Sequence, residues 1–375
     1  MKALVLSVNA GYGHHSTGQA VMGELEKRGF ECIMLDTLEY VNTHLAQSVA
    51  DGYLFSTKYM PNTYGKAYSK LDKREEEYGK YSLVTYFSKV VSKKLKALFD
   101  NYTPDVIIGT HSYACLLVTY LKAKGIIKCP TFGVVTDFTV HPFWESTDLD
   151  YYIVADSLLD RQMMKKGIEK EKILPYGIPV KEKFSRKMPQ KQAREELGIK
   201  DKPTILVMMG SMGFGNIAEN IKLIESVEGD FQILCVCGNN EKAKKEIESI
   251  EWKKDICVYG FVDNVDVMMD ASDCIVTKPG GLTTSEFLAK GLPAIILNPI
   301  PGQEERNMEF LVNNGAAVMV SETFPLDEAL YEILKYPWRM ELLKESVKHL
   351  GKPDSTVRVA EFIEEKLRIK DEVFI

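Results

Sequence analysis

Paired cysteines and long apolar runs are both absent from this sequence, and each absence excludes a class of protein. The seven cysteines, an odd number, are scattered along the chain and form no Cys-x-x-Cys pair. A disulfide framework and a zinc cage are therefore not indicated, and a reducing compartment is favoured. No apolar stretch is long enough to cross a bilayer, and the first apolar segment is too short for a signal-peptide core. We expect a soluble cytoplasmic protein or one attached peripherally to a membrane.

An excess of positive charge is missing as well. The chain has 47 Lys and Arg against 53 Asp and Glu, a net charge of −6, so general affinity for nucleic acid is not expected. Apolar residues make up 45% and charged residues 27% of the chain, which is typical of globular proteins. A length of 375 residues is sufficient for two domains.

Short β-branched runs alternate with helix-like segments along the whole chain, which predicts parallel sheets covered by helices on both faces. The series restarts near residue 203 after a Lys-rich stretch, so we expect a domain at 1–180, a linker at 181–202, a second domain at 203–352 and a terminal helix at 353–375. The predicted strands are Ala3–Val8, Cys32–Asp36, Val106–Gly109, Thr131–Thr136, Tyr151–Ala155, Thr204–Met209, Phe231–Cys237, Ile256–Gly260, Cys274–Thr277, Ala294–Leu297 and Ala316–Val320.

Both predicted domains begin with a strand that runs into a glycine-rich turn. The first turn spans residues 9–16 and the second spans residues 210–215. Open α/β sheets bind their ligands at the carboxyl ends of strands, where helix N-termini favour anions such as phosphate. Neither turn is a P-loop, because no Gly-Lys-Ser/Thr follows. Glycine can also serve only the backbone freedom of a turn, but two such turns at matching positions favour ligand binding.

The stretch from Asn42 to Asp100 interrupts the strand–helix pattern. It carries ten Lys and Arg against six Asp and Glu, together with ten aromatic residues. Its last part, Tyr81–Phe99, has apolar residues at helical spacing with lysines among them. Such a helix can lie on an anionic membrane surface. The alternative is a helix that covers a sheet and presents a solvated basic face.

The most informative segment follows the strand at 274–277 and reads Lys278-Pro279-Gly280-Gly281-Leu282-Thr283-Thr284-Ser285-Glu286. Its glycine pair lets a ligand approach the backbone, its Thr and Ser residues are candidate helix caps, and first-turn amides can hold a diphosphate. Glu286 lies one helical turn further on, where a carboxylate can accept both hydroxyls of a ribose. The alternative is a capped helix with a favourable N-terminal charge.

The next loop, Asn298–Asn307, also enters a predicted helix. It concentrates amide and carboxylate groups suited to sugar hydroxyls.

These two segments, followed by Asn314-Gly315, resemble the UDP-sugar signature of the diacylglycerol glycosyltransferases and of the peptidoglycan transferase MurG. Three N-terminal segments resemble the diacylglycerol branch, although Tyr12 stands where that family usually has glycine. They are Gly11-Tyr12-Gly13-His14, Val135-Thr136-Asp137-Phe138-Thr139-Val140-His141-Pro142-Phe143-Trp144 and Tyr176-Gly177-Ile178-Pro179-Val180. The resemblance covers nearly the whole chain.

The resemblance implies a GT-B fold of class α/β, in which two Rossmann-like parallel-sheet domains face a cleft. By this resemblance, the C-terminal domain would bind the donor, the N-terminal domain would bind the acceptor, and the terminal helix would cross back to the N-terminal domain. Reaction with inversion would give a β-glycoside. The resemblance assigns UDP-sugar binding to Gly13, Gly213, Lys278, Gly280, Gly281, Leu282, Thr283, Glu286, Gln303, Glu304 and Asn307.

Direct inversion needs a base beside the acceptor hydroxyl. His14 is one candidate, because histidine titrates near neutral pH, and Asp137 is the other. His141 and Trp144 are expected to shape the acceptor mouth. A metal is not expected, because the one Asp-x-Asp pattern, at residues 148–150, precedes a predicted strand, and helix-terminus amides with Lys278 can offset the diphosphate charge.

The expected partners are UDP-glucose or UDP-galactose and diacylglycerol in an anionic membrane, on the inner face of the cell membrane. No cofactor and no obligate protein partner are expected. A MurG-like transferase acting on a polyprenyl-linked acceptor, a UDP-sugar 2-epimerase and a non-catalytic UDP-sugar sensor are the alternatives. The sequence leaves open the donor sugar and the number of sugars added, since glucose and galactose differ at one hydroxyl.

Overall fold

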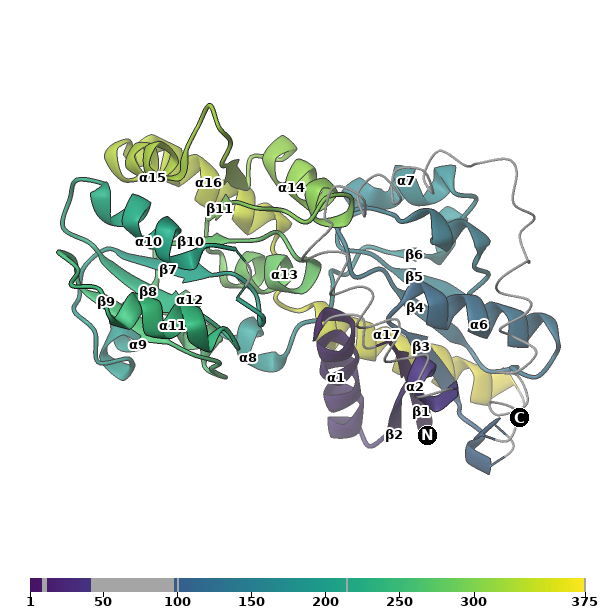
Figure 1. Cartoon of the computed structure of the whole chain (residues 1–375). Helices are drawn as coiled ribbons and strands as arrows, with labels where there is room; N and C mark the ends of the chain where they lie inside the picture. The colour runs from purple at the N-terminus through teal and green to yellow at the C-terminus, as the bar shows by residue number, and fades with distance from the viewer. Residues whose placement is uncertain (9–11, 42–97, 100, 214, 374–375) are drawn as a thin grey trace. The chain divides into compact units, whose positions relative to one another are not determined.

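The computed structural model describes residues 1–8, 12–41, 98–99, 101–213 and 215–373, which form two compact units (Figure 1). Unit 1 comprises Met1–Glu182 and Asp354–Ile375, and unit 2 comprises Lys183–Pro353. Nearly all of the basic, aromatic stretch at 42–100 lies outside the described residues. Its amphipathic helix at Tyr81–Phe99 therefore stays a prediction.

Unit 1 is built on one six-stranded parallel sheet, as the apolar runs predict. In order of pairing, its strands are β2 (Glu31–Asp36), β1 (Lys2–Ser7), β3 (Val106–Gly109), β4 (Thr131–Val134), β5 (Tyr151–Ile153) and β6 (Ile173–Leu174). Its helices include α1 (Tyr12–Lys27), α2 (Thr37–Val41), α6 (Ser112–Ala123), α7 (Asp160–Lys165) and α17 (Ser355–Val373), with 3₁₀ turns at η1 (Pro142–Ser146), η2 (Ser157–Leu159) and η3 (Lys170–Lys172).

Helices cover both faces of this sheet. On one face, apolar side chains of α1 and α17 pack with those of β1, β3 and β4 in a single buried cluster. On the other face, α6 approaches the strands so closely that glycine is needed beneath it. A Cβ on Gly109 would lie 2.5 Å from Sγ of Cys115 in α6. At Gly133 the crowding comes instead from the segment before β5, because a Cβ there would lie 2.6 Å from Leu149.

The terminal helix α17 is held to unit 1 by polar as well as apolar contacts. Arg28 at the end of α1 bonds Glu364 at 3.1 Å and Glu361 at 3.3 Å. The hydroxyl groups of Ser355 and Thr356 donate to the carbonyl oxygens of residues 178 and 180, at 3.1 and 2.6 Å. The last helix of the chain is therefore part of the core of unit 1.

Unit 2 contains a second six-stranded parallel sheet. In order of pairing, its strands are β12 (Ala317–Met319), β11 (Ala294–Ile296), β10 (Cys274–Thr277), β7 (Thr204–Met208), β8 (Gln232–Val236) and β9 (Ile256–Tyr259). Its helices are α8 (Glu182–Ser185, which begins on the last residue of unit 1), α9 (Gln190–Glu196), α10 (Ile217–Ser226), α11 (Glu241–Glu248), α12 (Val265–Ala271), α13 (Gly281–Lys290), α14 (Gln303–Asn313), α15 (Leu326–Lys335) and α16 (Pro337–Leu350).

Every strand predicted from the sequence is present, and no strand end differs by more than two residues. The predicted strand at 131–136 ends at Val134, although Val135 N still donates to Ile153 O at 2.9 Å. The strand β6 was not predicted, because it is only two residues long and lies in a Lys- and Glu-rich stretch without the apolar run of the other strands.

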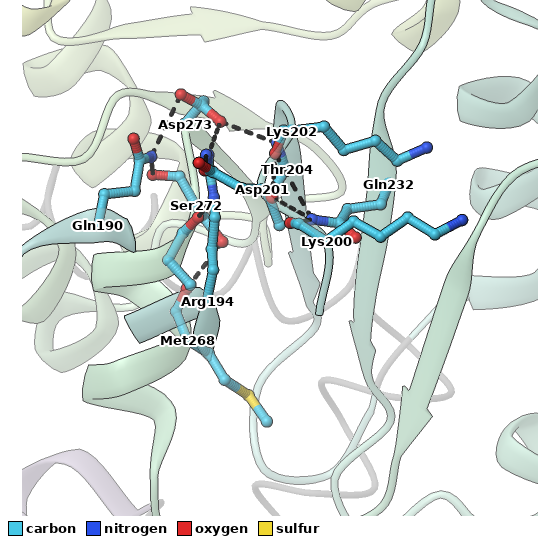
Figure 2. A network of polar contacts seen from close by, with 11 residues as sticks. Gln190, Arg194, Lys200, Asp201, Lys202, Thr204, Gln232, Met268, Ser272 and Asp273 are labelled. Carbon is cyan, nitrogen blue, oxygen red and sulfur yellow. Dashed lines mark hydrogen bonds and ion pairs between the residues drawn. The ribbon is translucent and has the colours of Figure 1, made fainter. Parts of the chain in front are cut away.

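The segment at 183–202 packs onto unit 2 through a polar network centred on Arg194 (Figure 2). The Arg194 guanidinium donates to Asp273 and Asp201, both at 2.8 Å, and to the carbonyl oxygen of Ala271 at 3.1 Å. Asp273 also accepts the backbone N–H of Thr204 at 2.8 Å. The network therefore joins α9 to the amino-terminal ends of β7 and β10.

Replacing Arg194 with Ala should lower the free energy of unfolding by about 3 kcal/mol, because Asp273 would lose its buried cationic partner. Lys200→Ala is the matched control, since the Lys200–Asp255 pair is exposed and should contribute little to stability. Urea unfolding followed by circular dichroism measures both changes. Equal, small losses in the two variants would show that the network does not hold α9.

Candidate active site

The sheet topology indicates where each unit binds its ligand. In an open parallel sheet, ligands bind beyond the carboxyl ends of the two strands at which the strand order reverses. In unit 1 these strands are β1 and β3, and in unit 2 they are β7 and β10. The four loops that follow these strands contain many of the residues that the sequence singles out.

His14 lies in the first turn of α1, directly after the loop that follows β1. Its Nδ1 is 2.8 Å from the carbonyl oxygen of Thr110, the residue after β3, and 2.9 Å from the hydroxyl of Thr136 after β4. A carbonyl oxygen only accepts hydrogen bonds, so Nδ1 carries the proton in the neutral ring. The lone pair of neutral His14 is therefore on Nε2.

Two opposing effects act on the pKa of His14. Burial is the larger and lowers the pKa below its usual value of 6.5, whereas the negative charge of Asp137 and the Thr110 carbonyl raise it. The neutral ring therefore predominates at neutral pH, and Asp137 favours the protonated form. His14 is therefore suited to abstract a proton, because its ring is neutral beforehand and the carboxylate of Asp137 stabilises the ring once it is protonated.

His111 lies beside His14 and was not among the residues predicted from the sequence. It lies two residues after the end of β3 and caps α6, because its Nδ1 accepts the backbone N–H of Tyr113 at 3.1 Å. Its ring meets the ring of His14 edge-on, with centroids 4.5 Å apart. Burial, followed by the proximity of His14 and His141, holds the pKa of His111 well below 6.5. Its position in the loop after a predicted strand was the available signal.

The predicted acceptor residues lie close together, His141 as the cap of η1 and Trp144 within it, but in different environments. His141 caps η1 by accepting the backbone N–H of Phe143 at 3.1 Å, and its ring packs on Phe143 at 4.5 Å. Trp144 is 4% exposed and packs against Tyr152. Burial lets Trp144 support the turn that carries His141, and contact of either residue with an acceptor stays a prediction.

In unit 2, the N-terminus of α13 follows β10, as predicted for the diphosphate segment. The helix cap is Gly280, however, and not one of the Thr or Ser residues expected from the sequence. The hydroxyl of Ser285 donates instead to the carbonyl of Gly281 at 2.8 Å. No side chain in the described part of the chain caps this helix, so the amides of Gly281, Leu282 and Thr283 remain suited to an anion.

A nearly buried ion pair joins the loop after β10 to the first turn of α14. Lys278 Nζ lies 3.2 and 3.4 Å from the two carboxylate oxygens of Glu304, and Glu304 also accepts the backbone N–H of Ile300 at 2.7 Å. Asn307 is fully buried and donates to the carbonyl of Pro279 at 3.0 Å. These contacts fix the shape of the Lys278–Gly281 loop, and contact of Glu304 and Asn307 with a sugar stays a prediction.

The other predicted donor residues lie on α13, on α14, in the first turn of α1 and in the turn after β7. Glu286 is in the second turn of α13, half-buried, and Gln303 is the first residue of α14. Gly13 lies in the first turn of α1. Their roles in binding stay predictions.

Gly213 shows why the turn after β7 needs glycine. Its φ is +58°, and a Cβ there would lie 2.2 Å from the carbonyl oxygen of Cys237, at the end of β8. The carbonyl of Gly213 accepts a hydrogen bond from Asn240 at 2.8 Å. The turn is therefore held against the loop after β8, so closely that any residue other than glycine would clash at position 213.

Family models match both halves of the chain. Residues 14–180 match the model described as monogalactosyldiacylglycerol (MGDG) synthase, and residues 204–355 match the C-terminal domain of glycosyltransferase family 28. Relatives named processive diacylglycerol beta-glucosyltransferase are 30% identical in Bacillus licheniformis, covering 94% of this chain and 92% of the relative, and in Bacillus cereus, covering 96% and 93%. The chain belongs to the MGDG synthase family. This confirms the resemblance inferred from its motifs. As a member of this family, the protein is a glycosyltransferase.

Solved structures place this member of the MGDG synthase family in the GT-B fold, which confirms the predicted fold class. MurG of Acinetobacter baumannii has a TM-score of 0.62 at 16% identity, covering 97% of this chain and 99% of its own. The calicheamicin glycosyltransferase CalG4 has a TM-score of 0.63 at 11% identity, covering 98% of each. A UDP-GlcNAc 2-epimerase from Neisseria meningitidis has a TM-score of 0.62 at 16% identity, covering 97% and 100%. Transferases and an epimerase share the fold, so the family and not the fold indicates the reaction.

Neither a spanning helix nor a cluster of metal ligands is found in the part of the chain that the structure describes. No helix there is both long and apolar enough to cross a membrane. The same residues contain no group of three or more His, Cys, Asp or Glu arranged to hold a metal ion.

Gly213→Ala should destabilise unit 2 and raise the donor KM, because the new Cβ both forces an L-residue into the left-handed region and meets Cys237. Gly210→Ala is the matched control in the same turn, since Gly210 also has a positive φ of +75° but open space around it. We expect a loss of about 1 kcal/mol for the control and about 3 kcal/mol for Gly213→Ala. Unfolding curves and donor titrations measure both, and equal effects would rule out the close approach to Cys237.

Proposed function

We propose that this glycosyltransferase moves a hexose, glucose or galactose, from a UDP-sugar to the free hydroxyl of diacylglycerol, with inversion, to form a β-glycosyl glycolipid. The observation that carries the proposal is His14, held at the switch point of unit 1 with its lone pair on Nε2. The family and its processive diacylglycerol beta-glucosyltransferase relatives support the acceptor and the sugar.

In the proposed reaction, His14 acts on the acceptor. Its Nε2 takes the proton of the diacylglycerol hydroxyl while the oxygen attacks the anomeric carbon from the side opposite UDP. Thr110 and Thr136 hold the ring through Nδ1, and Asp137 stabilises the imidazolium that forms. UDP leaves with the electrons of the broken C–O bond.

Unit 2 supplies the donor site in this proposal. The uncapped amides at the start of α13 hold the diphosphate, Glu286 accepts the ribose hydroxyls, and Gln303 and Glu304 at the start of α14 contact the sugar. Lys278 adds a positive charge whose present partner is Glu304. Helix amides and one lysine can offset the charge of the departing UDP, so the proposal assigns no metal.

The acceptor implies a site of action at a membrane. Diacylglycerol resides in the bilayer, and we propose that the chain acts peripherally at the inner face of the cell membrane. The basic, aromatic residues at 42–100 are suited to an anionic surface by composition.

The test is transfer of radiolabelled sugar from UDP-glucose and from UDP-galactose to diacylglycerol in anionic liposomes, with EDTA present. We expect a labelled β-glycosyl lipid from one of the two donors. Additional bands of slower mobility would show successive sugar transfers. Sugar isomerisation in solution without lipid labelling would instead establish an epimerase, and transfer only to a polyprenyl-linked acceptor would establish a MurG-like activity.

The pH dependence of kcat/KM distinguishes the two candidate bases. If His14 is the base, the acidic limb should fall below pH 6.5, because burial lowers its pKa and the neutral form persists to lower pH. Asp137→Asn should move this limb to still lower pH, since it removes the charge that raises the pKa of His14. His14→Ala should lower kcat by about 10²- to 10³-fold.

The matched control is His15→Ala, at a neighbouring position of α1. A His14→Ala variant that kept its rate, together with an inactive Asp137→Asn variant, would assign the base to Asp137.

A further inference from the structure

His14 and His111 form a pair of neutral imidazoles with opposite hydrogen-bonding capacity. In His14, Nδ1 is engaged as a donor to Thr110, so Nε2 can only accept. In His111, Nδ1 is engaged as an acceptor from Tyr113, so the proton is on Nε2, which can only donate. The ring centroids are 4.5 Å apart.

The ring of His111 is fixed on several sides. The hydrogen bond from Tyr113 N sets its rotation, and the Tyr113 ring stacks on it with centroids 5.1 Å apart at 19°. Tyr113 in turn packs against Phe143 at 5.4 Å. Within the described residues, neither Nε2 of His14 nor Nε2 of His111 has a hydrogen-bond partner of its own.

Diacylglycerol presents the complementary pair of groups. Its free hydroxyl has a proton to give up, and the adjacent carbon carries an ester whose carbonyl oxygen only accepts. One histidine that accepts beside one that donates matches a hydroxyl next to an ester. A base alone would not distinguish diacylglycerol from any other primary alcohol.

We propose that His111 contacts the acceptor directly and donates its Nε2–H to the ester next to the hydroxyl that His14 deprotonates. This inference rests on the proposed function, and it adds a residue that recognises the ester group of the acceptor. Selectivity for an ester follows, because an ether oxygen in the same position is a weaker and more hindered acceptor.

Two variants separate this role from the capping of α6. Asn is a good N-cap, so His111→Asn keeps an acceptor for the Tyr113 N–H but loses the donor at the position of Nε2. Gln is a poor N-cap but extends an amide N–H further from the backbone, so His111→Gln loses the cap and keeps a donor near that position. His349→Asn, on the exposed face of α16, is the control for the substitution itself.

The measurement is kcat/KM for a 1,2-diacylglycerol and for the dialkyl ether of equal chain length, in identical liposomes. The wild type should prefer the diester about tenfold, the value of one hydrogen bond. His111→Asn should lose about tenfold on the diester and little on the ether, which removes the preference. His111→Gln should retain most of the preference, and His349→Asn should match the wild type.

Other outcomes overturn the inference. Equal losses on both lipids, or an unchanged preference in His111→Asn, would limit His111 to capping α6. A shifted acidic limb of kcat/KM with an equal loss on both lipids would mean that it acts only through His14. A wild type that glycosylates the ether as well as the diester would refute ester recognition while leaving the proposed function intact. A wild type inactive on both lipids would overturn the proposed function and this inference together.

Discussion

The hydrogen bond between Nδ1 of His14 and the carbonyl oxygen of Thr110 connects the fold of unit 1 to its chemistry. It joins the loop after β1 to the loop after β3, the two strands at which the order of the sheet reverses. Because a carbonyl accepts and never donates, one backbone oxygen determines which nitrogen of a histidine holds the proton. The neighbouring residue, His111, takes the opposite tautomer for an equally local reason, the N–H of Tyr113.

Unit 2 places its predicted donor residues by rigid contacts between loops. The Lys278–Glu304 pair joins the loop after β10 to the first turn of α14, and the buried amide of Asn307 holds the backbone at Pro279. Gly213 brings the turn after β7 against the end of β8. In both units, residues brought together from loops far apart in sequence therefore surround the carboxyl ends of the strands, where parallel sheets bind ligands.

Much of the fold could be predicted from the sequence, because buried parallel strands leave continuous apolar runs such as Val106–Gly109 and Cys274–Thr277. The two-residue strand β6 leaves no such run and was missed. The position of Gly280 and Gly281 before a helix was readable, whereas the pairing of Lys278 with Glu304 was not, since the two residues are separated by 26 positions and meet only through the sheet. His111 was missed for a similar reason, because only the folded structure brings the ring of His14 from α1 beside it.

The chain leaves unit 1 at Glu182 and returns to it at Asp354. During synthesis, all of unit 2 therefore emerges from the ribosome before unit 1 can be completed. Until then, Arg28 lacks Glu361 and Glu364, and the sheet face between α1 and β4 lacks the apolar side chains of α17. Unit 2 is a contiguous segment that can fold as soon as it is made, whereas unit 1 must wait for α17. In a nascent chain that lacks α17, unit 1 is thus the part that stays unfinished.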